Sequence, residues 1–157
     1  MSHEILDPTN IFDNVSPIFW KKGRLQTFEH WPFSSDVQCN PDSMAAAGFY
    51  AIGGKDEPDL AECFMCGKQL DGWEPDDDPW QEHKKHQSNC PFISLGKKNE
   101  GSMTVKELFQ LIATYSLQKK RQEYEKALEE VKKNVEEATN SIPQIYENIK
   151  KSKKSLN

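Results

Sequence analysis

The sequence has no long apolar run. No stretch approaches the ~18 consecutive apolar residues that a membrane-spanning helix needs, and the mean hydropathy is −0.82. The first eight residues also lack the basic region and apolar run that are typical of a secretory signal peptide. Disulfides need an oxidising compartment, so the four cysteines are more typical of metal ligands than of an extracellular framework. We therefore expect no membrane association and no disulfides.

Three of the four cysteines share a pattern with a histidine. Two residues separate Cys63 from Cys66, sixteen separate Cys66 from His83, and six separate His83 from Cys90. Zn²⁺ prefers thiolate and imidazole ligands in a tetrahedron, and four protein ligands leave no open position for a substrate. The spacing therefore predicts one structural zinc ion. His86 also lies within reach of Cys90, so the spacing alone leaves the choice between His83 and His86 open.

Features of a catalytic site are scarce as well. Cys39 is the only thiol outside the zinc pattern, its neighbours Gln38 and Asn40 offer no general base, and no nucleophile motif is present. The sequence also has no second set of Cys/His pairs, and no RING-like array that would indicate ubiquitin-ligase activity. We therefore expect a protein without enzymatic activity.

Positive charge is scarce in the first part of the chain. Residues 1–96 carry 7 basic and 16 acidic residues, a net charge of −9, whereas residues 97–157 carry 13 and 9, a net charge of +4. Affinity for nucleic acids comes mainly from cations that meet phosphates, so direct DNA binding is not expected. An acidic surface instead favours a cationic partner, such as a free amino terminus or a basic tail.

Local signals predict an α+β fold. The pattern indicates three short strands at 49–52, 60–64 and 69–73, and a capping residue followed by proline starts a helix at Asn40 and at Asp78. We expect a short three-stranded antiparallel sheet with helices, stabilised by zinc because the apolar core is small. One long C-terminal helix follows. The expected parts are an N-terminal arm over 1–18, a zinc domain over 19–95, a linker over 96–103, a long helix over 104–142 and a basic tail over 143–157.

Acidic residues alternate with two tryptophans over 70–82. Asp71 and Asp77 can pair with an α-ammonium group, and Trp73 can wall a shallow apolar pocket. The last expected strand can also add a peptide strand to its edge. These features suit the capture of a free N-terminus with a small first side chain. The alternative is a zinc module without a peptide site, in which the acids only cap a helix and Trp73 belongs to the core.

From Leu117, the last third of the chain has apolar residues at heptad spacing, with Arg121 as the one charged member. The zinc domain offers too little surface to bury the apolar stripe of a helix this long, so we expect partner helices. The alternative is a helix folded back on the domain. Pro143 predicts that the continuous helix stops or kinks near Ser141. The residues expected to face partner helices are Leu108, Phe109, Ile112, Leu117, Tyr124, Leu128, Val131, Val135 and Ala138.

Several short motifs surround the zinc pattern: Arg24, Thr27-Phe28, Trp31-Pro32, Ala47-Gly48-Phe49, Gly72-Trp73, Asp78-Pro79 and Cys90-Pro91-Phe92. Together they resemble the baculoviral IAP repeat (BIR) family. The similarity covers roughly residues 19–142 and is most specific over 58–92. In that family the zinc ligands correspond to the three cysteines and His83, so the resemblance selects His83 over His86.

Within that family, the chain closely resembles the single-repeat member of the chromosomal passenger complex. The resemblance implies a non-enzymatic adaptor whose long helix bundles with helices of borealin and of the inner centromere protein. Such an adaptor targets Aurora B kinase to centromeres for chromosome segregation and cytokinesis. The resemblance also implies a homodimer when partners are absent, and a location in nucleus and cytoplasm, with centromeres and the spindle midzone in mitosis.

The resemblance further implies that the repeat domain reads a phosphorylated histone tail that begins Ala-Arg-phosphoThr. By position, the residues that would bind it are Leu70 and Trp73 for alanine, Asp71, Asp77 and Glu82 for the α-ammonium group, and Lys68, His86 and Glu57 around the phosphate. A similar groove in the family binds Smac-like N-terminal peptides, so the alternative function is an anti-apoptotic protein that binds Smac or inhibits caspases directly. Two departures are Asn40-Pro41, which replaces a Thr-Pro kinase site, and an arm over 1–18 that does not match.

Overall fold

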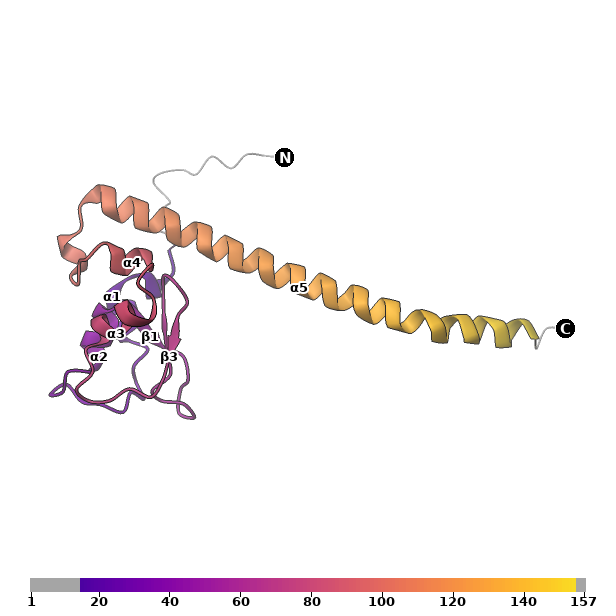
Figure 1. Ribbon diagram of the computed structural model, residues 1–157, viewed down its shortest axis with the longest axis horizontal. Helices are drawn as coiled ribbons and strands as arrows, with labels where there is room; N and C mark the ends of the chain where they lie inside the picture. The colour runs from indigo at the N-terminus through magenta and orange to yellow at the C-terminus, as the bar shows by residue number, and fades with distance from the viewer. Residues whose placement is uncertain (1–14, 155–157) are drawn as a thin grey trace. The chain divides into compact units, whose positions relative to one another are not determined.

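The computed structural model describes residues 15–154, with side chains up to Lys151. The predicted arm therefore falls largely outside the described residues. Contacts divide the chain into a first unit that ends at Ser116 and a second unit that begins at Leu117. The elements (Figure 1) are the 3₁₀ helix η1 (Pro17–Phe19), α1 (Lys21–Leu25), α2 (Pro41–Ala46), β1 (Phe49–Ala51), β2 (Ala61–Cys63), β3 (Gln69–Leu70), α3 (Pro79–His86), α4 (Pro91–Ser94), η2 (Glu100–Ser102) and α5 (Val105–Lys154).

The three strands form one antiparallel sheet in the order β1-β2-β3, and the predicted α+β class is confirmed. Phe49 pairs with Cys63, and Ala61 pairs with Leu70. The third strand ends at Leu70, earlier than the sequence predicts, because Gly72 has a φ of +69°, which turns the chain out of an extended conformation.

Side-chain caps start two helices where the sequence predicts them. Asn40 accepts a hydrogen bond from the backbone of Ser43 at 2.9 Å and begins α2. Asp78 accepts from the backbone of Trp80 at 2.9 Å and begins α3. Proline occupies the first turn in both helices, where its missing N–H leaves no helical hydrogen bond unmade. The two caps fix the points at which the chain enters the core.

An aromatic cluster fills the centre of the first unit. The ring of Phe19 lies edge-on to the rings of Phe64 and Tyr115, with centroids 5.4 and 5.3 Å away. Arg24 is fully buried, its guanidinium lies 4.4 Å from the centre of the Phe64 ring, and its Nε donates to the carbonyl of Ala45 at 2.9 Å. These contacts offset the cost of removing the cation from water.

The beginning of α5 belongs to this core. Leu111, Ile112 and Tyr115 are each at most 5% exposed. Ile112, which the sequence assigns to a partner helix, is therefore a core residue, and Leu108 is half-buried against the same cluster. Side chains three and four residues apart share one helix face, and here that face covers the domain. Phe109 lies off it and is 38% exposed.

The second unit is the rest of α5. It continues through Pro143 to Lys154, whereas the sequence predicts a stop or kink near Ser141. Proline removes one backbone hydrogen bond, and at this exposed position water can bind the freed carbonyl of Thr139. None of the described helices is long and apolar enough to cross a membrane. The large apolar side chains of the heptad stripe are each more than half exposed: Leu117, Tyr124, Leu128, Val131, Val135, Ile142, Ile145 and Ile149.

Candidate functional site

Four potential metal ligands converge in the first unit. β2 ends at Cys63, the turn after it supplies Cys66, α3 supplies His83, and Cys90 precedes α4. Their ligand atoms all lie within 4.8 Å of one another. His86 is not part of this group and lies on the surface, so the structure brings together the set with His83.

The spacing of these atoms fits a tetrahedral zinc ion. Tetrahedral bonds of about 2.3 Å to sulfur and about 2.0 Å to nitrogen place two sulfurs about 3.8 Å apart, and sulfur and nitrogen about 3.5 Å apart. The Sγ atoms of Cys63 and Cys90 are 3.9 Å apart, and Cys66 Sγ lies 3.5 Å from His83 Nε2. A disulfide, with sulfurs about 2.05 Å apart, does not match these separations. The four residues therefore form a site that can hold a metal ion.

A second contact orients the imidazole. His83 Nδ1 lies 2.8 Å from the backbone carbonyl of Ala47, which accepts its proton. A proton on Nδ1 leaves the lone pair of Nε2 free to face the thiols and a metal. His83 is fully buried, and the ring of Phe49 packs beside it at 4.8 Å between centroids. The sheet and α2 thus fix the imidazole that α3 supplies.

Burial and hydrogen bonds shift the pKa values of three of the four potential ligands. Burial raises the pKa of the Cys63 thiol, whereas hydrogen bonds from Cys63 and Cys66 lower the pKa of Cys90. Burial alone would lower the pKa of His83, but hydrogen bonds with Cys66, Cys90 and a backbone carbonyl raise it to about 9. A metal ion that binds these four residues displaces the protons that remain on them.

A shallow groove of about 240 Å³ lies between the end of β3 and α3, and we call it the Trp73 groove. It gathers six of the eight residues that the sequence assigns to peptide binding. Lys68 and Glu57 are not among its lining residues, whereas Gly72, Glu74 and Lys85, which the sequence reasoning missed, are. The full lining is Leu70, Asp71, Gly72, Trp73, Glu74, Asp77, Glu82, Lys85 and His86.

Trp73 is both a core residue and a wall of the groove. Its side chain is only 7% exposed, and its ring lies 5.3 Å from that of Phe49. Its Nε1 donates to the carbonyl of Leu70 at 3.3 Å, and the backbone N–H of Gly72 donates to Asp59 at 3.0 Å. The two roles of Trp73 that the sequence leaves open are therefore compatible, because the same ring packs against Phe49 and lines the groove.

The acidic side of the groove is a tight turn. The Oδ2 atom of Asp77 accepts from the backbone N–H of Glu74 at 2.8 Å, and the N–H of Asp77 donates back to the carbonyl of Glu74 at 3.1 Å. Asp71 is exposed and also lines the groove. Three carboxylates, those of Asp71, Glu74 and Asp77, thus line the same groove as the apolar Trp73, and this combination favours a cation with a small apolar group beside it.

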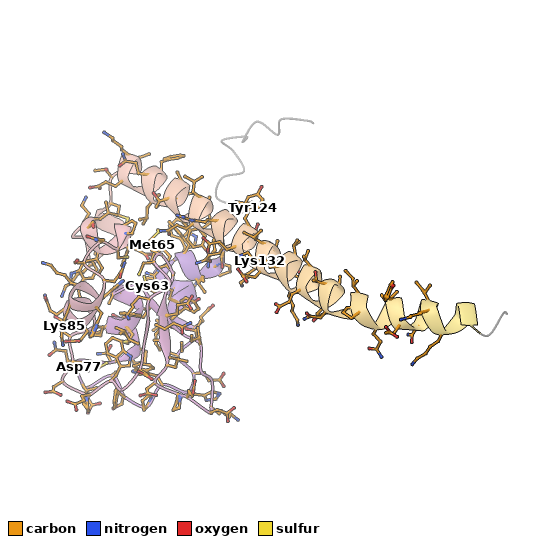
Figure 2. All side chains as sticks on the ribbon, turned by 45° about the vertical axis from the view of Figure 1, so that its right-hand side comes forward. Cys63, Met65, Asp77, Lys85, Tyr124 and Lys132 are labelled. Carbon is orange, nitrogen blue, oxygen red and sulfur yellow. The ribbon has the colours of Figure 1, made fainter. Side chains whose placement is uncertain are left out.

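Helix α3 contributes Glu82, Lys85 and His86 to the groove. Glu82 Oε2 lies 3.1 Å from Lys85 Nζ and 3.3 Å from His86 Nε2, all on the last two turns of α3. Figure 2 labels Asp77 and Lys85, which mark the acidic and the basic side of the groove. The same view shows Tyr124 and Lys132 projecting from α5, where both side chains are exposed.

Comparison with known proteins agrees with these features. A family model described as "BIR: Inhibitor of Apoptosis domain" matches residues 24–94. A Rattus norvegicus protein named Baculoviral IAP repeat-containing protein 5 is 39% identical over 84% of this chain and 89% of its own length. A Cavia porcellus protein of the same name is 48% identical over 60% of this chain and 66% of its own length.

A Xenopus laevis relative, Baculoviral IAP repeat-containing protein 5.1-A, is 57% identical over 47% of this chain and 46% of its own length. Among solved structures, one titled "Crystal structure of DIAP1 BIR1 bound to a Grim peptide" is 31% identical with a TM-score of 0.41, covering 48% of this chain and 71% of that one. The sequence relatives bear out the resemblance to survivin, the single-repeat passenger member. The chain belongs to the baculoviral IAP repeat-containing protein 5 family.

Proposed function

We propose that this protein is a non-enzymatic adaptor of the chromosomal passenger complex. Its Trp73 groove binds a histone tail that begins with a free Ala-Arg-phosphoThr sequence, and its long helix joins partner helices. The observation that carries the proposal is the groove itself, which is lined by the apolar side chains of Leu70 and Trp73, by four carboxylates, and by Lys85 and His86.

The acidic side suits an α-ammonium group. Asp77 is fixed by the turn that it forms with Glu74, and Asp71 lines the same groove. A carboxylate that is already held in place, as that of Asp77 is, loses less side-chain freedom when it binds a cation. The edges of Leu70 and Trp73 leave room for a small side chain such as alanine. An acetylated or internal alanine lacks the positive charge and would gain little from this site.

The helix supports the assembly half of the proposal. Its heptad stripe is more than half exposed from Leu117 to Ile149, and a row of large apolar side chains in water favours association with other helices. We assign borealin and the inner centromere protein as the partners, and Aurora B kinase as the enzyme that is recruited through the complex. A homodimer forms when these partners are absent. Nuclear and cytoplasmic location, with centromeres and the spindle midzone in mitosis, follows from these partners.

Fluorescence anisotropy with three labelled tail peptides tests the groove. The peptides begin with Ala-Arg-Thr, Ala-Arg-phosphoThr, and N-acetyl-Ala-Arg-phosphoThr. We expect the second to bind most tightly and the third to lose most of its affinity. Asp77→Asn should weaken the two free-amine peptides by about 2 kcal/mol, because the amide keeps the bond to Glu74 but loses the charge.

Asp76→Asn is the matched control, since Asp76 is an exposed neighbour outside the groove lining. It changes the net charge equally and should leave affinity within about twofold, the scale of exposed charge effects. Equal effects of the two variants would show that binding depends on general acidity and not on the groove.

The same groove supports a second candidate function, an anti-apoptotic one, because the chain carries an Inhibitor of Apoptosis domain. Smac-like peptides also begin with a free alanine and would use the acidic side. Competition between an Ala-Val-Pro-Ile peptide and the histone peptide tests this, with mutual displacement expected. Direct caspase inhibition is tested separately with purified chain and active caspase, and unchanged caspase rates at micromolar protein would rule it out.

A further inference from the structure

One charged side chain interrupts the heptad stripe of α5. Arg121 follows Leu117 by four residues and precedes Tyr124 by three, so it lies in the stripe at an a position, where a side chain faces a helical partner. We infer that Arg121 selects the partner of this helix: it favours a helix that places a carboxylate opposite it, and it disfavours parallel pairing with a second copy of this chain. This inference rests on the assembly proposed above and adds its specificity.

The contacts of Arg121 within α5 leave most of its donors available. Its Nε lies 3.2 Å from Oε1 of Glu125, one turn later on the same helix. Within the described part of the chain, neither Nη atom of Arg121 has a hydrogen bond. A guanidinium presents five N–H donors in a planar fork that matches a carboxylate. The two Nη atoms can therefore bind a carboxylate of another helix while Nε keeps its bond to Glu125.

The exposure of the stripe shows what association does to this charge. The side chain of Arg121 is 81% exposed, and the neighbouring Leu117 and Tyr124 are 72% and 75% exposed. A partner helix that covers these two neighbours also removes the guanidinium from water. A buried charge without a partner is strongly unfavourable, whereas a hydrogen-bonded carboxylate opposite it offsets the cost. The stripe therefore favours a partner with an acid at this level.

The same residue opposes self-association through the stripe. In a parallel pair of identical helices each a position meets its own counterpart, so Arg121 of one copy would face Arg121 of the other. The two like charges would repel each other as water leaves the interface. The later members of the stripe, from Leu128 to Ile149, carry no charge, so this discrimination depends on one residue. A homodimer must form through another surface or with its helices antiparallel.

The outer face of α5 provides a matched control. Lys126 is exposed and follows Arg121 by five residues, which places it about 140° around the helix, outside the stripe. A substitution there changes the net charge of the chain as the same substitution at Arg121 does, but it leaves the surface that meets a partner unchanged.

Calorimetric titration of the full zinc-loaded chain with purified helical segments of borealin and the inner centromere protein tests the choice of partner. Arg121→Glu should weaken the complex by at least about tenfold, because two carboxylates then face each other. Lys126→Glu makes the same change in net charge and should stay within about twofold. Equal affinities of the two variants would overturn the inference, since the guanidinium would then reach past the interface into water.

Charge reversal identifies the carboxylate of the partner. Each acidic residue of the two partner segments is replaced in turn by lysine, and each product is titrated with the Arg121→Glu chain. We expect one position to restore affinity by at least about fivefold and to weaken binding of the unmodified chain. Restoration at no position, or equally at many, would show that no specific carboxylate lies opposite Arg121 and would overturn the inference.

Arg121→Leu tests the effect on self-association. Without partner segments, this chain should self-associate at least about tenfold more strongly than the unmodified chain in sedimentation equilibrium, because its stripe is then apolar throughout. Lys126→Leu, which adds an equal apolar group outside the stripe, should not. Equal self-association of the two variants would contradict the role of Arg121 against self-pairing.

The unmodified chain distinguishes the inference from the assembly on which it rests. Failure of this chain to bind either partner segment would overturn the proposed assembly and the inference with it. Tight binding by the unmodified chain, with no difference between the Arg121 and Lys126 variants, would overturn the inference alone.

Discussion

Arg24 Nη2 lies 2.6 Å from Glu100 Oε1, which joins α1 to a segment 76 positions later in the chain. The same carboxylate accepts from the backbone N–H of Lys21 at 2.9 and 3.0 Å, and the guanidinium also donates to the carbonyl of Phe19 at 2.6 Å. The segment between the zinc domain and α5 is therefore held to the domain and is not a free linker.

Loss of this ion pair should destabilise the first unit. Glu100→Gln keeps an acceptor but removes the negative charge that pairs with the buried Arg24, so we expect the free energy of unfolding to fall by about 1.5–3 kcal/mol. Urea unfolding followed by tryptophan fluorescence measures it. Glu29→Gln, at an exposed position, is the control and should change little. Equal urea midpoints for the two variants would show that the ion pair between Arg24 and Glu100 does not stabilise the first unit.

Removal of the metal should unfold the first unit. His83→Ala should abolish zinc binding and lower the melting temperature, since a structural site contributes folding free energy directly. His86→Ala should retain one zinc per chain, because His86 lies outside the ligand cluster. Metal analysis of the purified variants decides between them, and zinc loss in His86→Ala alone would reverse the assignment. A chelator should reproduce the His83→Ala result in the unmodified chain.

The start of α5 should respond to acid. Glu107 accepts bonds from Lys97 Nζ at 2.6 Å and from the backbone and hydroxyl of Thr104 at 2.7 and 2.9 Å. These bonds, that of Lys97 first, lower the pKa of Glu107 from 4.5 to about 2. The carboxylate is thus favoured in the folded state. Its stabilisation is complete above about pH 4.5 and is lost as the pH falls toward 2.

Melting curves between pH 7 and pH 2 measure this effect. Glu107→Gln removes the titrating group, so the variant should be less stable than the unmodified chain at neutral pH, and the difference should narrow as the pH falls. Parallel curves for the two proteins would show that Glu107 contributes nothing to the acid response.

The heptad stripe of α5 should govern assembly. Leu128→Glu combined with Val135→Glu places two charges in the stripe and should weaken binding of borealin and inner centromere protein helices by at least about 3 kcal/mol. Gln122→Glu combined with Asn140→Glu adds the same charge outside the stripe and is the control. Light scattering after gel filtration of the mixtures measures the complex. Equal loss of partner binding in both double variants would show that the added charge, and not the apolar stripe, weakens the complex.

Residues whose effect is local were predicted well. The helix starts at Asn40 and Asp78 follow from capping chemistry that involves only the next few residues, and the structure confirms both. The spacing of the cysteines marks a metal site, but it could not choose between His83 and His86. That choice depends on which face of α3 meets the thiols, and without the family resemblance only the packing of the helix decides it.

Other predictions failed because they depend on contacts between distant segments. Heptad spacing does not reveal that the first turns of α5 cover the domain, so Ile112 was assigned to a partner when it lies in the core. Pro143 favours a break by its local chemistry, yet the helix continues on both sides of it. Lys85 was missed because nothing in the sequence tells which lysine near the groove faces into it.

The sequence alone determined the three cysteine ligands of the metal site, the α+β class, the acidic tryptophan segment and the apolar stripe of the long helix, because each depends on residue type and spacing along the chain. Only the tertiary structure decided that Trp73 both packs in the core and lines the groove, that Glu82 contacts Lys85 and His86, and that Glu100 pairs with Arg24. Those relationships depend on how elements pack against one another, and packing is set by the whole chain.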